Sequence, residues 1–218
     1  MGREAVVDDL TGLLLMLPPL LFALTFHEFS HAWVAMRLGD PTARILGRLT
    51  LNPIAHLDVM GTMVFILTRR IGWAKPVPVD ERYLSHPRRD MMWIALAGPV
   101  SNLCLAFLFG SLLRIAAAGA PSAGTLAILL RMVQESVWIN LALAVFNLIP
   151  LFPLDGSRIL TGLLSPALAE RYRSLDRVGP FVLLGVVVLG MVTGVNLFAF
   201  VINPVVYALG GLFSGGVL

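Results

Sequence analysis

The hydrophobic positions of this 218-residue chain gather in long stretches with very few charged side chains. The first stretch covers residues 10–38, the second 91–118 and the third 124–151, while the last, residues 179–218, has no charged residue. A helix of roughly 20 apolar residues is long enough to cross a bilayer. The pattern therefore predicts an all-α polytopic membrane protein with about four to six transmembrane segments.

Two places interrupt this pattern. Between the first and second spans, residues 39–90 hold one apolar run, Val59–Leu67, that is too short to cross a bilayer. The Pro-rich stretch Lys75–Val79 follows it and predicts an extended segment with an unpaired edge. We therefore expect a short re-entrant or extended hairpin element here. In the last stretch, Thr193–Asn196 leaves open either one long span or a broken pair of spans.

Composition supports a membrane protein and excludes several other classes. Hydrophobic residues make up 57% of the chain and charged residues 13%, whereas a soluble domain has about 45–50% and about 25%. Cys104 is the only cysteine, which excludes a disulfide framework and a cysteine zinc finger. The formal charge of +3 is too thinly spread for nucleic-acid binding. We expect one membrane-embedded domain over residues 1–218, with a core at 10–160 and apolar spans at 179–213.

The positions of the basic residues predict the orientation. Thirteen of the 16 Lys and Arg residues lie at the end of the first span, between the first and second spans, or after the third. By the positive-inside rule this side faces the cytoplasm, and the N-terminus then lies outside. We expect a multi-pass protein of a cell membrane, the inner or plasma membrane of a prokaryote.

The strongest chemical signal is the sequence His27-Glu28-Phe29-Ser30-His31 inside the first span. On a helix the i,i+4 spacing places both imidazoles on one face, where they can bind the same Zn²⁺ ion. Glu28 lies beside them without being a ligand, placed to take a proton from water at the metal. Packing alone is a poor explanation, because three ionisable groups at bilayer depth cost several kcal/mol without a partner.

Catalytic zinc takes three protein ligands, so a third residue must join the histidine pair. Asp155 leads the candidates, because it follows the cytoplasmic end of the third span and so meets the pair at a similar depth. Its carboxylate has a second reading as a helix N-cap for the residues from Ser157 onward. The other candidates for the third ligand are His56, Asp58 and His86.

Two further polar residues have alternative roles. Asn147 lies about two helical turns before Asp155 and is expected either to stabilise an oxyanion or to satisfy a neighbouring backbone group. His56 is expected to be an auxiliary ligand, a gate over the site, or a hydrogen-bonded loop histidine.

Four motifs follow one another along the chain: His27-Glu28-x-x-His31, Asn52-Pro53-x-x-His56, Gly98-Pro99-x-x-Asn102 and Asn147-x-x-Pro150-x-x-x-x-Asp155-Gly156. In this order they resemble the motifs of the site-2 protease family of intramembrane zinc metalloproteases. The resemblance covers about two thirds of the chain, residues 20–160. Without the PDZ insert or the CBS domain of some members, the chain looks like a minimal version of the family.

The resemblance implies one zinc ion per chain, bound by His27, His31 and Asp155, with Glu28 as general base. It implies cleavage of peptide bonds in transmembrane protein or peptide substrates, with Asn147 holding the scissile carbonyl. The active site would lie toward the cytoplasmic side. The resemblance also places a candidate substrate-pairing segment near the substrate path, namely Trp73, Lys75, Pro76, Val77, Pro78 and Val79.

Two rival functions are a membrane metal transporter and a non-catalytic scaffold. A transporter needs polar residues through both leaflets, and the first span offers none between Thr11 and Thr25. A purely structural site needs no base beside its ligands, so Glu28 argues against a scaffold. The bilayer is the expected surroundings, and the sequence leaves open whether glycine-rich faces such as Gly185–Gly194 pack within one chain or in a homo-oligomer.

Overall fold

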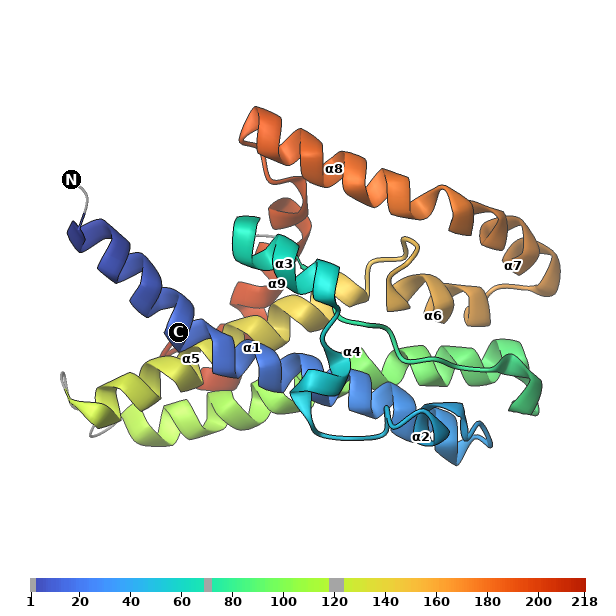
Figure 1. Cartoon of the computed structure of the whole chain (residues 1–218), viewed down its shortest axis with the longest axis horizontal. Helices are drawn as coiled ribbons and strands as arrows, with labels where there is room; N and C mark the ends of the chain where they lie inside the picture. The colour runs from blue at the N-terminus through green and yellow to red at the C-terminus, as the bar shows by residue number, and fades with distance from the viewer. Residues whose placement is uncertain (1–2, 69–71, 118–123) are drawn as a thin grey trace.

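The structure is a computed structural model that describes residues 3–68, 72–117 and 124–218 (Figure 1). Within these ranges it is helical, and an isolated bridge between Leu57 and Ala74 is the one β contact. Four helical stretches are long and apolar enough to cross a membrane: Gly12–Arg37, Pro87–Ala116, Thr125–Asn147 and Leu197–Ser214. A bent helix pair adds a fifth candidate. The predicted all-α polytopic membrane protein is therefore confirmed.

Three long helices form the centre of the molecule. They are α1 (Arg3–Arg37), α4 (Pro87–Ala117) and α5 (Thr125–Asn147), and each packs against the other two. The helix α9 (Leu197–Ser214) covers α4 and α5. Its Val206 completes a buried apolar cluster with residues of α4 and α5, namely Ala106, Val137 and Leu141.

Short elements fill the chain between α1 and α4. They are α2 (Thr42–Ile45), η1 (Pro53–His56), α3 (Val59–Thr68) and η2 (Glu81–Tyr83). The short apolar run forms α3, and residues 74–80 are extended beside the bundle, as expected. Gly61 lets α3 approach the backbone of Trp73 closely, because a Cβ at position 61 would lie 2.2 Å from the carbonyl oxygen of Trp73.

The extended segment is held from one side. The buried guanidinium of Arg48 donates hydrogen bonds to the carbonyls of Lys75 and Pro76. The amide of Lys75 donates to the carbonyl of His56, and the amide of Asp80 donates to Asp40. These contacts fix both ends of the segment and leave its middle facing the bundle.

The last part of the chain starts with α6 (Asp155–Leu163), which packs on α4, and continues through α7 (Pro166–Arg173) and η3 (Ser174–Arg177). A bend of 54° separates these from α8 (Gly179–Thr193). Between α8 and α9 the helical structure is interrupted at Gly194, whose φ of +75° suits a residue without Cβ. Of the two readings of the uncharged tail, the broken pair is the one observed.

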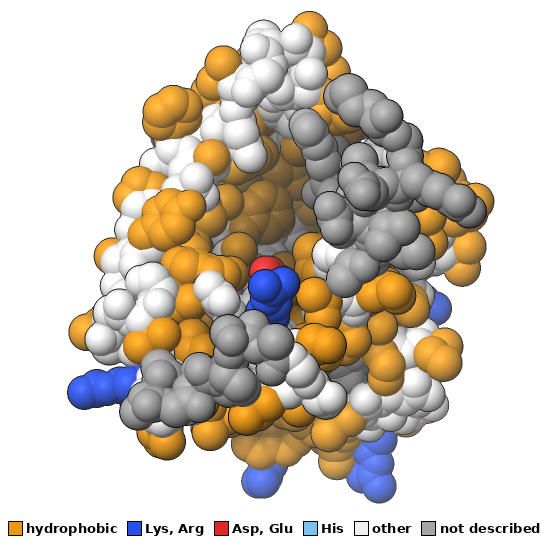
Figure 2. Space-filling model, turned by 90° about the vertical axis from the view of Figure 1, so that its left-hand side faces the viewer, with side chains coloured by type: hydrophobic (Ala, Val, Ile, Leu, Met, Phe, Trp, Pro, Cys, Tyr) orange, Lys and Arg blue, Asp and Glu red, His pale blue; other side chains and the backbone are white. Residues whose placement is uncertain are grey.

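The basic segments share one end of the bundle. In Figure 1 α2, α6 and α7 lie at the end opposite the N-terminus. Arg69 and Arg70, two of the basic residues between the first and second spans, lie outside the described residues. Figure 2 shows the other end, where hydrophobic side chains are spread over the described surface and a central hollow holds basic and acidic side-chain atoms.

Candidate metal centre and active site

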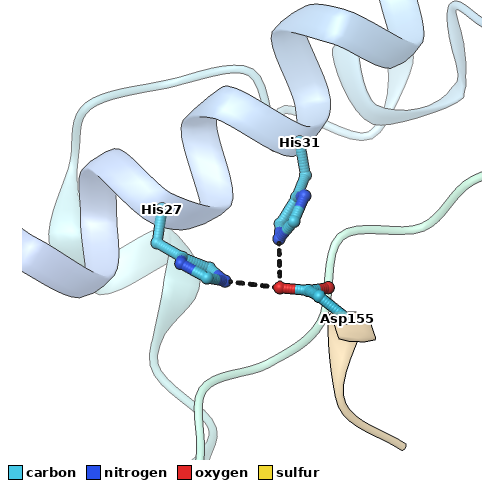
Figure 3. Close-up of side chains that lie close together, drawn as sticks. All are labelled: His27, His31 and Asp155. Carbon is cyan, nitrogen blue, oxygen red and sulfur yellow. Dashed lines mark hydrogen bonds and ion pairs between the residues drawn. The ribbon is translucent and has the colours of Figure 1, made fainter. Parts of the chain in front are cut away.

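The HExxH motif lies in the C-terminal half of α1, and its His27, Glu28 and His31 are buried, each with 9% or less of its surface exposed. The helical spacing brings the two imidazoles together, with ring centroids 4.6 Å apart. Both rings point away from the α1 axis toward the start of α6 (Figure 3).

Asp155 meets this pair from the start of α6. Its Oδ2 lies 3.1 Å from Nε2 of His27 and 3.3 Å from Nε2 of His31. The three ligand atoms lie within 4.8 Å of one another, and they form the one such group of metal-ligand side chains in the described part of the chain. The reading of Asp155 as an N-cap is wrong, because Leu154 is the N-cap of α6 and Asp155 is its first residue, with its side chain turned to the histidines.

A glycine allows α6 to begin at this point. The chain leaves α5 at Asn147 and turns back, and the new helix packs against the carbonyls of Leu148 and Ile149. A Cβ at Gly156 would lie 2.3 Å and 2.4 Å from these oxygens. Gly156 therefore serves a close approach of two backbone segments, which fixes Asp155 under the histidine pair.

The far side of each imidazole is hydrogen-bonded to an oxygen. Nδ1 of His27 lies 2.6 Å from Oδ1 of Asn102, and Nδ1 of His31 lies 2.7 Å from the carbonyl of Ile94. Because both partners are acceptors, each Nδ1 carries the proton that it donates. In a neutral ring the lone pair then lies on Nε2, the atom that faces Asp155.

This donor set fits a zinc ion. Two imidazole nitrogens and a carboxylate oxygen are the ligand types of catalytic zinc, and three acceptors held this close need a proton or a metal ion between them. Gly98 on α4 leaves the room, since a Cβ there would lie 2.5 Å from Nε2 of His31 and 2.6 Å from Nε2 of His27.

The electrostatic setting of Asp155 favours its ionised form. Burial would raise the pKa of this carboxyl, but when the imidazoles are protonated the charge of His31 and the Nε2–H hydrogen bonds from both rings outweigh burial and hold the pKa well below its usual range. The helix α6 is not among the candidate membrane spans. Asp155 therefore presents a carboxylate to a cation at neutral pH.

A cavity of about 210 Å³ opens next to the cluster. Glu28 lines it, and Oε2 of Glu28 accepts a hydrogen bond of 3.2 Å from the amide of Val77. The middle of the extended segment thus reaches the carboxylate beside the candidate metal ligands. The cavity is also lined by Pro76, Val79, Met91, Ile94, Asn147, Pro153 and Arg158.

The other predicted residues fall in two groups. Asn147 lines the cavity, where its Nδ2 donates to the carbonyl of Leu143 within α5. By contrast, the structure does not bring His56, Asp58 or His86 to the histidine pair. Nε2 of His56, the last residue of η1, donates a hydrogen bond to the carbonyl of Thr50. The members of the expected substrate-pairing segment that do not line the cavity are Trp73, Lys75 and Pro78.

Residues that the sequence did not single out also shape the site. Asn140 is fully buried on α5, and Arg48 is buried against the extended segment. Neither belongs to a motif described above. For Asn140 the available signal was a polar side chain inside an apolar stretch, which in a membrane span needs a partner.

The chain is similar to proteins named as metalloproteases. It is 44% identical over 168 residues to "Putative zinc metalloprotease YwhC" of Bacillus subtilis, which covers 76% of this chain and 76% of the relative. It is 33% identical over 181 residues to "Putative zinc metalloprotease Rip2" of Mycobacterium tuberculosis strain H37Rv, covering 81% of this chain and 66% of the relative.

The family model for Peptidase family M50 matches residues 109–192, from the second half of α4 to the end of α8. No solved structure matches the chain. Identity above 40% along three quarters of both this chain and the Bacillus relative is decisive: the chain belongs to Peptidase family M50, the site-2 protease family.

Proposed function

We propose that this protein is an intramembrane zinc metalloprotease that hydrolyses peptide bonds of transmembrane substrates. The observation that carries the proposal is the meeting of His27, His31 and Asp155 beside Glu28 in a bundle of candidate membrane spans. Membership of a protease family and the names of the relatives support the proposal.

The three clustered side chains would hold the zinc ion. When bound, zinc supplies Lewis-acid chemistry, because it lowers the pKa of water toward about 7 and polarises a carbonyl oxygen. The remaining work falls to side chains of this chain. The Nδ1 hydrogen bonds of His27 and His31 hold both rings with Nε2 directed at the site.

Glu28 acts as the general base in this proposal. Its carboxylate lies in the cavity beside the ligands, accepts the proton of the attacking water, and passes that proton to the leaving amine. The hydrogen bond from the Val77 amide keeps Oε2 directed into the cavity. A glutamine at position 28 has a similar shape but cannot accept the proton.

The substrate would bind along the extended segment. A transmembrane helix hides its carbonyls in i→i−4 hydrogen bonds, so it must unwind before cleavage. In the described part of the chain, the carbonyl of Val77 and the amide of Val79 have no hydrogen-bond partner. Pro76 and Pro78 lack an N–H group. The free edge therefore offers one acceptor, at Val77, and one donor, at Val79. It can pair with an unwound strand by β-augmentation.

Asn147 is placed to assist at the substrate carbonyl. Its Nδ2 has one hydrogen engaged by the carbonyl of Leu143, which leaves the second hydrogen for the cavity. This group would donate to the oxygen on which charge develops.

The orientation follows from charge. The end of the bundle with α2, α6 and α7 carries most of the basic residues and would face the cytoplasm. The N-terminus would lie outside, in a cell membrane, and water and the substrate's cytoplasmic portion would reach the site from the basic end. We place the whole function in one membrane-embedded domain.

The test is metal content together with cleavage of a synthetic transmembrane peptide, measured on detergent-purified wild type, Glu28→Gln and Asp155→Ala. We expect one zinc per chain in wild type and in Glu28→Gln, less in Asp155→Ala, and cleavage by wild type alone. Undiminished cleavage by Glu28→Gln would overturn the general base. A zinc-free wild type would overturn the enzyme, and full zinc in Asp155→Ala would overturn the third ligand.

A further inference from the structure

Two asparagines are buried completely in the interior of the bundle. Asn102 on α4 and Asn140 on α5 have no exposed surface, and both lie within candidate membrane spans. A buried amide in an apolar helix destabilises the fold unless each of its polar atoms has a partner. The positions of these partners therefore show what the two side chains do.

The hydrogen bonds run in one direction, from α5 to the metal site. Nδ2 of Asn140 donates to the carbonyl of Ser136 at 2.8 Å, which turns Oδ1 of Asn140 toward α4. Nδ2 of Asn102 donates to this Oδ1 at 2.8 Å and to the carbonyl of Ala23 at 3.2 Å. Oδ1 of Asn102 is then left for Nδ1 of His27, 2.6 Å away.

The direction matters because an asparagine amide can be turned by 180° about its last bond. With Asn102 turned, its Oδ1 would face two acceptors, the oxygens of Ala23 and Asn140, and its NH₂ would face Nδ1 of His27. The imidazole would then carry its proton on Nε2, the atom directed at Asp155. A protonated Nε2 has no lone pair for a metal ion.

We infer that Asn140 is a positioning residue for the zinc ligand His27 and acts through Asn102. The oxygen of Asn140 fixes the orientation of the Asn102 amide, and that amide fixes the tautomer and the plane of the imidazole. This inference rests on the proposed zinc site. It joins α5, which supplies no ligand, to the ligand pair on α1.

The experiment compares Asn140→Leu with two matched variants. Leucine has a similar volume but no oxygen for Asn102. In Asn140→Asp a protonated carboxyl keeps both bonds, since its carbonyl accepts from Asn102 and its hydroxyl donates to Ser136. Ser136→Ala removes another buried polar group one turn away on α5, whose Oγ donates only to the carbonyl of Met132.

The readouts are the zinc dissociation constant, from competition with a chelator, and the visible absorption spectrum of the cobalt-substituted protein. We expect Asn140→Leu to bind zinc about 10- to 100-fold more weakly, with an altered cobalt spectrum. Asn140→Asp should restore both readouts, and Ser136→Ala should leave both unchanged.

Four outcomes would overturn the inference. Wild-type affinity and spectrum in Asn140→Leu would remove it while leaving the proposed function intact. Equal loss in Ser136→Ala, or no restoration in Asn140→Asp, would show that Asn140 acts through general packing of α5. A wild type without zinc would overturn the proposed function and this inference together.

Discussion

The central helices and α8 are both apolar and differ in how the rest of the molecule contacts them. The helices α1, α4 and α5 pack against one another and bury polar side chains, including His27, Asn102 and Asn140. The helix α8 has no charged residue. In the described part of the chain, its main contact with another helical element is with η3. Phe181 and Val192 of α8 are 73% and 80% exposed.

This difference shows what decides position in a membrane protein. Lipid satisfies a uniformly apolar helix on every side, so hydrophobicity alone does not choose its neighbours. A polar side chain in such a helix must find a partner, and that partner fixes which helix lies beside it. The candidate site residues are thus placed by the same groups that order the central bundle.

The largest expected effect comes from adding one methyl group at the metal centre. In Gly98→Ala the new Cβ would clash with the Nε2 atoms of both histidines, at 2.5 Å and 2.6 Å. The rings would have to turn away from Asp155, so we expect zinc affinity to fall at least about 100-fold and cleavage to be lost. Zinc titration and peptide cleavage measure the two effects.

The same substitution in α8 is the matched control. A Cβ at Gly185 meets no atom within 4 Å, so Gly185→Ala should bind zinc and cleave peptide like wild type. If Gly98→Ala retained wild-type zinc affinity, the close approach of α4 to the ligand pair would be wrong.

The next effect concerns packing stability. Leu141 of α5 is fully buried in the apolar cluster with α4 and α9. We expect Leu141→Ala to lower the free energy of unfolding by about 2–4 kcal/mol, because it leaves a cavity. Leu184→Ala, at a residue of α8 that is 59% exposed, should change it by less than about 0.5 kcal/mol. Denaturant unfolding in detergent tests this, and equal losses would contradict the difference between the two regions.

The smallest expected effect lies at the break between α8 and α9. Oδ1 of Asn196 accepts a hydrogen bond from the amide of Ala199 and so caps α9. Asn196→Ala should destabilise the first turn of α9 by about 1 kcal/mol, seen as faster amide hydrogen exchange there. Asn196→Asp keeps the acceptor and should exchange like wild type. Unchanged exchange in Asn196→Ala would show that the cap adds nothing to this turn.

The spans followed well from the sequence, and their boundaries less well. The third span was expected to reach residue 151, yet α5 ends at Asn147, because the chain turns there toward α6. The sequence did not decide whether α8 and α9 would be two separate helices. Gly194 permits a break between them but does not require one, and the break became visible only with α9 packed on α4 and α5.

The candidate site was predicted to different extents. The pairing of His27 with His31 is local, since a helix places residues four apart on one face. Asp155 was one of four candidates for the third ligand. The roles of Gly98, Asn140 and Arg48 were not assigned, because each depends on a contact between segments far apart in the sequence.

By itself the sequence determined the kind and approximate number of spans and one face of the candidate metal site, because hydrophobic length and helical spacing act within a single segment. The tertiary structure alone decided which carboxylate meets the histidines, which amide orients His27 and which backbone edge reaches Glu28. These depend on how helices cross and how closely their backbones approach. Such contacts are fixed by packing at glycines and by buried hydrogen bonds, and no single segment contains them.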